Sequence, residues 1–378
     1  MSPPSRTLIL ATLLLAGCGK ATPAKAKPTP APAPIAASAS GSAVFERGRA
    51  VYAQLCATCH GPAGNGYASD NAPSLRTATF LASANDAFFR DSIVRGRPGT
   101  AMPAYGQALG GPLSAADVQA LVTFLRAGSP PAVTLAAGAV AGDAEQGKTL
   151  YQSTCARCHG TEKQRSTAVH LLNPTFLQTA SDQFLRYAIT EGRWPTSMLA
   201  WKTALSAKQI DDLVAYLRSK AVAIGPAVAA QPPPRPPRAG PIVLNPRGRA
   251  PQFTLKEGLY VSIDEVKAAL DAKRRLIITD ARPPSDWMNL HIAGAISTPY
   301  YDLHTLDDLP KDGTWIIAYC ACPHHVSGIV VDELRKRGYT HTAVLDEGVY
   351  AWQQKKYPVV AAPGTPPPAA PPPPPSAR

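Results

Sequence analysis

The feature that most constrains this chain is a five-residue pattern, C-x-x-C-H, which occurs twice at an interval of 99 residues. The first copy is Cys56-Ala57-Thr58-Cys59-His60 and the second is Cys155-Ala156-Arg157-Cys158-His159. The similarity extends upstream and downstream, because residues 48–61 parallel residues 147–160. An internal repeat of this length predicts two small units of the same kind.

Two cysteines followed directly by a histidine form the attachment signature of c-type haem. The two thiols make thioether bonds to the porphyrin, and the histidine ligates the iron from one side. A zinc site would need further cysteine or histidine ligands, and residues 44–128 contain no histidine besides His60. The sequence therefore predicts two haem c groups. Their predicted attachment cysteines are Cys56, Cys59, Cys155 and Cys158, and their predicted axial histidines are His60 and His159.

The ligand on the other side of each iron can be inferred by elimination. Of the four methionines in the chain, Met102 is the only one in the first unit and Met198 the only one in the second. Both stand in the pattern G-R-x-x-T-x-M-x-A-aromatic. A proline-containing loop can hold a thioether over a haem without a helix. We expect Met102 and Met198 to be the ligands, with His170 as the alternative to Met198.

Each unit closes with a helical pattern that begins at a serine. The sequences starting at Ser114 and Ser206 have the form of capping boxes, S-x-x-D and S-x-x-Q. Apolar residues follow at helical spacing, namely Val118, Leu121, Val122 and Leu125, and Ile210, Leu213, Val214 and Leu217. These patterns predict a C-terminal helix in each unit.

With a helix running into C-x-x-C-H, a methionine loop and a closing helix, each unit resembles a small class I cytochrome c. The resemblance covers residues 44–221 and implies two all-α domains. Histidine and methionine ligation implies a rather positive reduction potential. Because both axial positions are then filled, the resemblance implies electron carriers whose partners are other redox proteins, such as cytochromes, an oxidase or a dehydrogenase.

Residues 252–361 have a different character, with short apolar runs alternating with helical patterns. We expect strands at 276–280, 315–319 and 343–345, and helices at 264–270 and about 326–337. This alternation predicts an α/β fold with a parallel sheet.

Three landmarks of this third unit occur in a familiar order: Asp280-Ala281-Arg282, the run from His291 to Ile296, and the run from Leu345 to Trp352. With a cysteine at the end of the intervening strand, they resemble a rhodanese-like domain. The resemblance implies that Cys320 carries sulfane sulfur as a persulfide. It also places Asp280 and Arg282 among the candidate site residues. A loop leading into a helix N-terminus favours a thiolate or persulfide.

The loop after Cys320 departs from the common sulfurtransferase pattern. It reads Cys320-Ala321-Cys322-Pro323-His324-His325-Val326 and contains no arginine, which argues against phosphatase relatives. His324 and His325 are candidates for positive charge or proton transfer, or are loop histidines without a role. Cys322 is a candidate for attack on a persulfide at Cys320. The alternatives are that this cysteine pair has no catalytic role or that it binds a metal with the histidines.

The N-terminus has the form of an export signal. Arg6 is followed by a short apolar run, residues 8–16, that is too short to span a bilayer. The sequence Leu15-Ala16-Gly17-Cys18 resembles a bacterial lipoprotein box, which implies cleavage before Cys18 and a lipid anchor on it. The alternative is ordinary signal-peptide cleavage. We expect a periplasm-facing protein, and Gly19 after the cysteine favours the outer membrane over the inner one.

The distribution of prolines and of charged residues separates the folded units from the linkers and the ends of the chain. Forty prolines crowd into segments that cannot bury enough apolar surface to fold, and the linker before the third unit should act as a semi-rigid spacer that lets this unit swing. The expected layout is: signal peptide 1–17, tether 18–43, cytochrome c domains 44–130 and 143–221, linker 222–251, rhodanese-like domain 252–361 and tail 362–378. The three domain stretches carry only +3 of the net charge of +12. The rest lies in the ends and linkers, which argues against a nucleic-acid partner.

Taken together, these patterns suggest a lipid-anchored electron carrier whose third unit handles small sulfur compounds for a respiratory chain. A second hypothesis is an electron shuttle whose rhodanese-like unit only docks or senses. A third is a sulfurtransferase tethered to an unrelated cytochrome.

Overall fold

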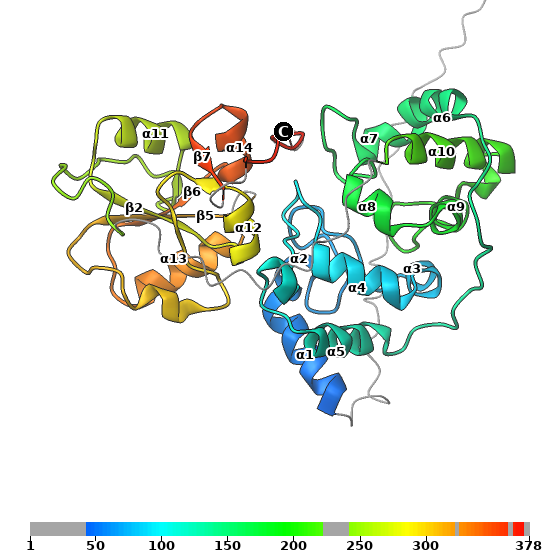
Figure 1. The fold of residues 1–378 in the computed structure, drawn as a ribbon, viewed down its shortest axis with the longest axis horizontal. Coiled ribbons are helices and arrows are strands. Elements are labelled where there is room, and N and C mark those ends of the chain that lie inside the picture. The colour runs from blue at the N-terminus through cyan, green and yellow to red at the C-terminus, as the bar shows by residue number, and fades with distance from the viewer. Residues whose placement is uncertain (1–42, 222–241, 322–324, 362–365, 374–378) are drawn as a thin grey trace, which may run out of the picture. The chain divides into compact units, whose positions relative to one another are not determined.

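The computed structural model describes residues 43–221, 242–321, 325–361 and 366–373 (Figure 1). Cys18, Cys322 and His324, together with the expected signal peptide and tether, lie outside the described residues. None of the helices in the described ranges is both long and apolar enough to cross a membrane.

The first unit is helical, as its repeat predicts. Its helices are α1 (Ala43–Leu55), α2 (Ala57–His60), α3 (Ala78–Ser83), α4 (Asp86–Arg95) and α5 (Ala115–Arg126), with a short 3-10 turn at Gln107–Leu109. The buried face of α5 contains Val118, Leu121, Val122 and Leu125, the four residues whose spacing predicted the helix. The Ser114 side chain accepts from the N–H of Asp117, and the Asp117 carboxylate accepts from the N–H of Ser114. The predicted capping box is therefore confirmed.

The second unit repeats this arrangement. It consists of α6 (Ala144–Leu150), a π-helical turn (Tyr151–Cys155), α7 (Ala156–His159), α8 (Pro174–Thr179), α9 (Asp182–Glu191), a 3-10 turn (Trp201–Thr203) and α10 (Ala207–Ser219). A capping box at Ser206 and Gln209 begins α10, again as predicted. The helix leading to the second C-x-x-C-H differs from α1, because it widens into the π-helical turn before Cys155.

In both units the first and last helices cross at a glycine. A Cβ on Gly48 would lie 2.0 Å from the carbonyl oxygen of Ala120, and one on Gly147 would lie 1.9 Å from that of Asp212. Only a residue without a side chain permits this close approach. The crossing holds the segment before each C-x-x-C-H against the closing helix.

We expect Gly48→Val to destabilise the first unit by about 3 kcal/mol, because overpacking at a rigid backbone contact relaxes little. The measurement is the free energy of unfolding of the haem-loaded protein, with far-UV circular dichroism as the signal that monitors unfolding. Ala50→Val is the matched control, since Ala50 is exposed on the same helix. Equal stability of the two variants would contradict the glycine crossing.

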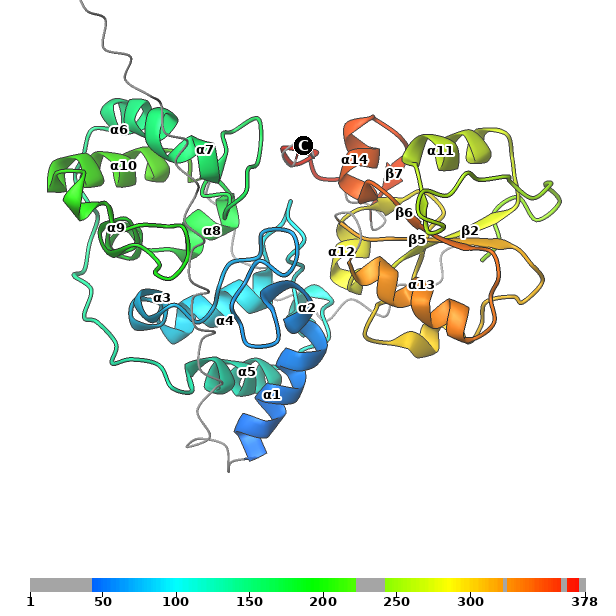
Figure 2. The ribbon, with the colours of Figure 1, turned by 180° about the vertical axis from the view of Figure 1, so that it is seen from behind.

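The third unit is a parallel sheet between helices. Its strand order is β1-β6-β5-β2-β4, with every neighbouring pair parallel. The strands are β1 (Tyr260–Val261), β2 (Leu276–Asp280), β4 (Ile296–Ser297), β5 (Trp315–Tyr319) and β6 (Thr342–Leu345), and β3 (His291–Ile292) pairs antiparallel with β7 (Val359–Val360). The helices are α11 (Ile263–Asp271), α12 (Pro284–Asn289), α13 (Val326–Lys336) and α14 (Gly348–Gln354), with a 3-10 turn at Leu303–Leu306. Both views show α11 and α14 on one side of the sheet and α13 on the other (Figures 1 and 2).

This arrangement explains why β2 and β5 are apolar without alternation. All five residues of β2 are buried, since helices cover both faces of the central strands. The α/β fold with a parallel sheet that the sequence predicts is therefore confirmed.

Candidate functional site

The first C-x-x-C-H lies at the end of the α1–α2 segment. The His60 ring is buried, and its Nδ1 lies 2.8 Å from the carbonyl oxygen of Pro73. Burial lowers the pKa of His60, which favours the neutral ring. If Nδ1 carries the proton and donates to Pro73, the Nε2 atom is left to bind a metal.

The second C-x-x-C-H has the same surroundings. The Nδ1 of His159 lies 2.8 Å from the carbonyl oxygen of Val169, and burial again lowers the pKa of this histidine. A buried tyrosine in the helical segment before each motif donates a hydrogen bond to the glycine carbonyl that follows the motif. Tyr52 donates to the Gly61 carbonyl at 2.7 Å, and Tyr151 donates to the Gly160 carbonyl at 3.0 Å. The two histidines are thus oriented by equivalent bonds.

The two methionine loops share one hydrogen-bond pattern. The N–H of Met102 donates to the Thr100 hydroxyl at 3.1 Å, and the N–H of Met198 donates to the Thr196 hydroxyl at 3.2 Å. The carbonyl of each methionine accepts from the N–H of an arginine, at 2.8 Å in both loops. This pattern gives a physical reason for the threonine and arginine in the repeated motif.

The glycine of the motif has a conformational reason as well. Gly96 and Gly192 have φ of +62° and +66°, in the left-handed region that favours glycine. A Cβ on Gly96 would lie 2.3 Å from the carbonyl carbon of Pro103. Each loop thus turns back tightly toward its methionine.

One continuous cavity joins the two units, with about 2680 Å³ of space between its atoms, its open mouth included. Both predicted ligand sets line it: Cys56, Cys59, His60 and Met102 from the first unit, and Cys155, Cys158, His159 and Met198 from the second. Two thiols, one neutral imidazole and one thioether per unit are the donor set that c-type haem requires. The residues therefore fit this group.

His170, the alternative to Met198, also lines the cavity. Its Nε2 lies 3.0 Å from the carbonyl oxygen of Thr161. If Nε2 carries the proton and donates to Thr161, the Nδ1 atom is left to bind a metal, so His170 stays the alternative to Met198. Met198 is favoured by the hydrogen-bond pattern that its loop shares with the loop of Met102.

In the third unit, Asp280 and Arg282 form a buried ion pair at the end of β2. Arg282 Nη2 lies 2.7 Å from Asp280 Oδ2, with 4% and 0% of the two side chains exposed. Asp286 lies on the other side of the guanidinium at 3.5 Å, and its burial raises its pKa to about 6. Arg282 lines the pocket that contains Cys320, whereas Asp280 faces the arginine. The geometry gives Asp280 a supporting position behind the pocket.

Cys320 directly follows β5 and is 2% exposed. Its sulfur accepts a hydrogen bond from the Ser327 hydroxyl at 3.3 Å, and Ser327 lies in the first turn of α13. The 11-residue helix α13 therefore begins close to this sulfur, as the loop reasoning predicted. Sequence reasoning assigned no role to Ser327, although this residue stands at the end of the cysteine loop.

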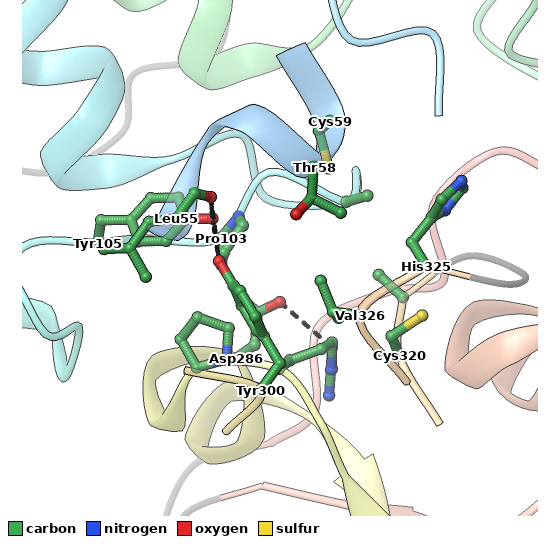
Figure 3. Close-up of a pocket in the computed structure, with 14 residues that line it drawn as sticks. Leu55, Thr58, Cys59, Pro103, Tyr105, Asp286, Tyr300, Cys320, His325 and Val326 are labelled. Atoms are coloured by element: carbon green, nitrogen blue, oxygen red, sulfur yellow. Dashed lines mark hydrogen bonds and ion pairs between the residues drawn. The ribbon is translucent and has the colours of Figure 1, made fainter. Parts of the chain in front are cut away.

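The Cys320 pocket has a second wall made by the first unit (Figure 3). Its space is about 420 Å³, open solvent included. Arg282, Pro283, Asp286, Tyr300, Cys320, Ala321, His325 and Val326 line one side, and Leu55, Thr58, Cys59, Ala101, Pro103 and Tyr105 line the other. Burial is the main cause of the raised pKa of Cys59, and the charge of nearby Cys320 adds to it. A predicted haem-attachment cysteine and the candidate sulfur-carrying cysteine thus share one pocket.

Hydrogen bonds join the third unit to the first beside this pocket. The Tyr300 hydroxyl donates to the Leu55 carbonyl at 3.0 Å and lies 3.3 Å from the Tyr105 hydroxyl. The Ser285 hydroxyl donates to the Ala104 carbonyl at 2.7 Å. These contacts differ from the expectation of a swinging third unit. Proline content predicts a stiff spacer, but it does not predict which surface residues of the third unit contact the first unit.

Comparison with known proteins agrees with these two kinds of site. Residues 43–125 and 142–217 match the family model described as cytochrome c oxidase, cbb3-type, subunit III, and residues 262–355 match that of the rhodanese-like domain. A cbb3-type cytochrome c oxidase subunit CcoP from Azospirillum brasilense is 28% identical over 189 residues, which are 46% of this chain and 60% of that protein.

The third unit has its own relatives. A probable adenylyltransferase/sulfurtransferase MoeZ from Mycobacterium tuberculosis is 29% identical over 105 residues, 27% of this chain and 26% of that protein. A solved rhodanese-like domain from Anabaena sp. is 27% identical, covers 29% of this chain and 86% of that domain, and has a TM-score of 0.26. The chain spans about three fifths of the length of the curated cytochrome relative, and about a quarter of the sulfurtransferase.

Proposed function

Because this chain combines a haem-binding cytochrome c region with a C-terminal rhodanese-like domain, we propose that it is a di-haem electron carrier that binds or transfers sulfane sulfur at Cys320. It would link the handling of small sulfur compounds to a respiratory chain. The observation that carries the proposal is the shared pocket, which is lined by both Cys320 and Cys59 of the first C-x-x-C-H.

The electron-transfer half rests on the duplicated ligand sets. His60 with Met102, and His159 with Met198, would hold one haem c each, and a bound haem c takes up or releases one electron. The cytochrome relatives are named as subunits of a cbb3-type cytochrome c oxidase. An oxidase or another cytochrome is therefore the electron partner we propose.

The sulfur half rests on the surroundings of Cys320. The start of α13 and the Ser327 hydroxyl stabilise negative charge on its sulfur. With thiosulfate, the Cys320 thiolate would take the outer sulfur and form a persulfide. The sulfur–sulfur bond of thiosulfate breaks and sulfite leaves with the bonding electron pair. His325 lines the same pocket and would supply polar contact to an entering anion.

We also propose a location for the protein. The export signal and Cys18 support a lipid-anchored, periplasm-facing protein, preferably at the outer membrane. Cytochrome c maturation outside the cytoplasm is compatible with this. Metabolic labelling with a radioactive fatty acid, compared between the native protein and Cys18→Ser, tests it, and labelling of both would contradict the anchor.

Incubation of the haem-loaded protein with thiosulfate should add one sulfur atom, about 32 Da by atomic mass, to a peptide containing Cys320. Cys320→Ser should stay unmodified, because serine cannot form a persulfide. Intact-protein and peptide mass spectrometry make the measurement, and the visible haem spectrum confirms that both proteins are folded. An equal mass shift in both proteins would contradict the assignment.

The second function, an electron shuttle with a docking or sensing domain, is favoured by the burial of Cys320 at 2% exposure. It predicts no sulfur loading and equal haem reduction by sulfide or a small persulfide in the native protein and Cys320→Ser. Haem reduction that requires Cys320 would instead establish that the sulfur and electron functions are coupled.

A further inference from the structure

Two arginines at corresponding positions of the methionine loops are half-buried, and their side-chain hydrogen bonds go to uncharged oxygens. Arg97 donates to the hydroxyls of Ser92 at 2.6 Å and Thr179 at 3.3 Å, and to the Gly96 carbonyl. Arg193 donates to the Gly192 carbonyl at 3.3 Å, and its Nη2 has no hydrogen-bond partner among the described residues. Burial lowers the pKa of both guanidinium groups to about 10, and Asp91 offsets part of this effect for Arg97.

Each guanidinium reaches from its own unit into the other. Thr179, an acceptor for Arg97, belongs to the second unit. The aromatic contacts also cross between the units, because each arginine lies near one phenylalanine ring of the first unit and one of the second. Arg97 lies 5.8 Å from the ring centroids of both Phe88 and Phe176, and Arg193 lies 5.2 Å from that of Phe184 and 5.9 Å from that of Phe80. Phe88 and Phe184 stack on each other with centroids 4.8 Å apart.

Burial of a cation without a counter-ion is unfavourable, and aromatic faces and neutral oxygens compensate only part of its cost. A buried Nη2 without an acceptor adds a further penalty. Both arginines line the cavity that contains the ligand sets. An anion in this cavity would be a counter-ion for the two arginines and a hydrogen-bond acceptor for the Nη2 atom of Arg193.

We infer that Arg97 and Arg193 form one shared anion site for the carboxylate side groups of the two haems, and that each arginine acts on both cofactors. Haem c carries two propionates, which are the anions that this cavity would receive. A guanidinium can bind such a carboxylate through two parallel hydrogen bonds. The inference rests on the two haems proposed above.

A simpler role would be packing alone, in which the two arginines only pack against the phenylalanine rings. These rings are Phe80, Phe88, Phe176 and Phe184. Packing accounts for the aromatic contacts, but it does not account for the partnerless Nη2 of Arg193 or for the equivalent placement of both cations on the cavity wall. The two roles also differ in what they predict for the cofactor. A positive charge beside the haem favours the reduced state in either role. Only an arginine that binds a propionate also shifts the propionate Raman bands when an apolar side chain replaces it.

The test is a potentiometric titration of the haem-loaded protein with Arg97→Leu and Arg193→Leu. Each change should reduce the equilibrium constant for reduction about tenfold at the nearer haem, which is about 59 mV for one electron. A smaller fall in the same direction is expected at the other haem. Resonance Raman spectroscopy gives an independent readout, since the propionate bending bands should shift when their hydrogen bonds are lost.

Arg90→Leu is the matched control, because Arg90 is an exposed arginine of the same unit. If a leucine variant fails to fold, Arg97→Lys and Arg193→Lys replace it, because lysine keeps the positive charge and lacks the planar guanidinium. In these lysine variants the propionate Raman bands should still shift, whereas the reduction potential should stay close to that of the native protein. Unchanged potentials and Raman bands in folded variants would overturn the inference. An effect confined to one haem would overturn the shared site. A haem content of one per chain, measured as the pyridine haemochrome, would instead refute the proposed di-haem function.

Discussion

Replacing Met198 by histidine is expected to lower the reduction potential of the haem proposed for the second unit by roughly 0.1–0.3 V, a sizeable part of the range that axial ligands span. The thioether stabilises ferrous iron, and an imidazole stabilises it less. The Thr196 hydroxyl holds the backbone of residue 198, so the loop should keep its shape. The same change at Met102 should lower the potential of the first haem.

An optically monitored redox titration makes this measurement, with Met288→His in the third unit as the control. His170→Ala belongs in the same series, because it separates the two candidate ligands. A large change in potential for His170→Ala, with none for Met198→His, would show that the histidine ligates the iron and would contradict the assignment of Met198.

Removal of the Asp280 carboxylate is the change with the largest expected effect on stability. Asp280→Ala leaves the guanidinium of Arg282 buried without its main counter-ion, and breaking such a pair typically costs 3–5 kcal/mol. We expect a loss of about 4 kcal/mol in the free energy of unfolding of the third unit. Denaturant unfolding followed by tryptophan fluorescence measures it.

The double variant Asp280→Ala/Arg282→Met should recover part of this loss, since no unpaired charge remains. Asp271→Ala is the matched surface control: its partner Lys267 forms an exposed i,i+4 pair, and such pairs change stability by about 0.5 kcal/mol or less. An Asp280→Ala protein as stable as this control would show that the buried pair contributes little.

The elements that the sequence predicted most accurately are those governed by local chemistry. The strands at 276–280 and 315–319 were predicted with the bounds of β2 and β5. The capping boxes at Ser114 and Ser206 were predicted because a cap involves only neighbouring residues. The C-x-x-C-H motifs and the methionine loops repeat, and the repeat identified ligand candidates that a single copy would have left ambiguous.

What the sequence did not reveal depends on contacts between distant residues. Tyr300 and Tyr105 meet across a separation of 195 residues. Tyr105 is the aromatic residue that ends the first methionine pattern, but the pattern does not indicate that it meets Tyr300. Arg97 and Arg193 were part of the repeated pattern, but their exchange of aromatic partners appears only when the two units pack. The π-helical turn at Tyr151–Cys155 was missed because its sequence keeps the helical pattern of the first unit.

The single cavity that spans both ligand sets has an electrostatic consequence for redox titration. If it holds two haems, an electron on one lies in a space of low dielectric that the other shares, where charges interact more strongly than in water. The second electron would then be harder to add than the first, even if the two haems had the same intrinsic affinity for an electron. Such negative cooperativity would make the singly reduced protein the dominant form over a broad interval of applied potential.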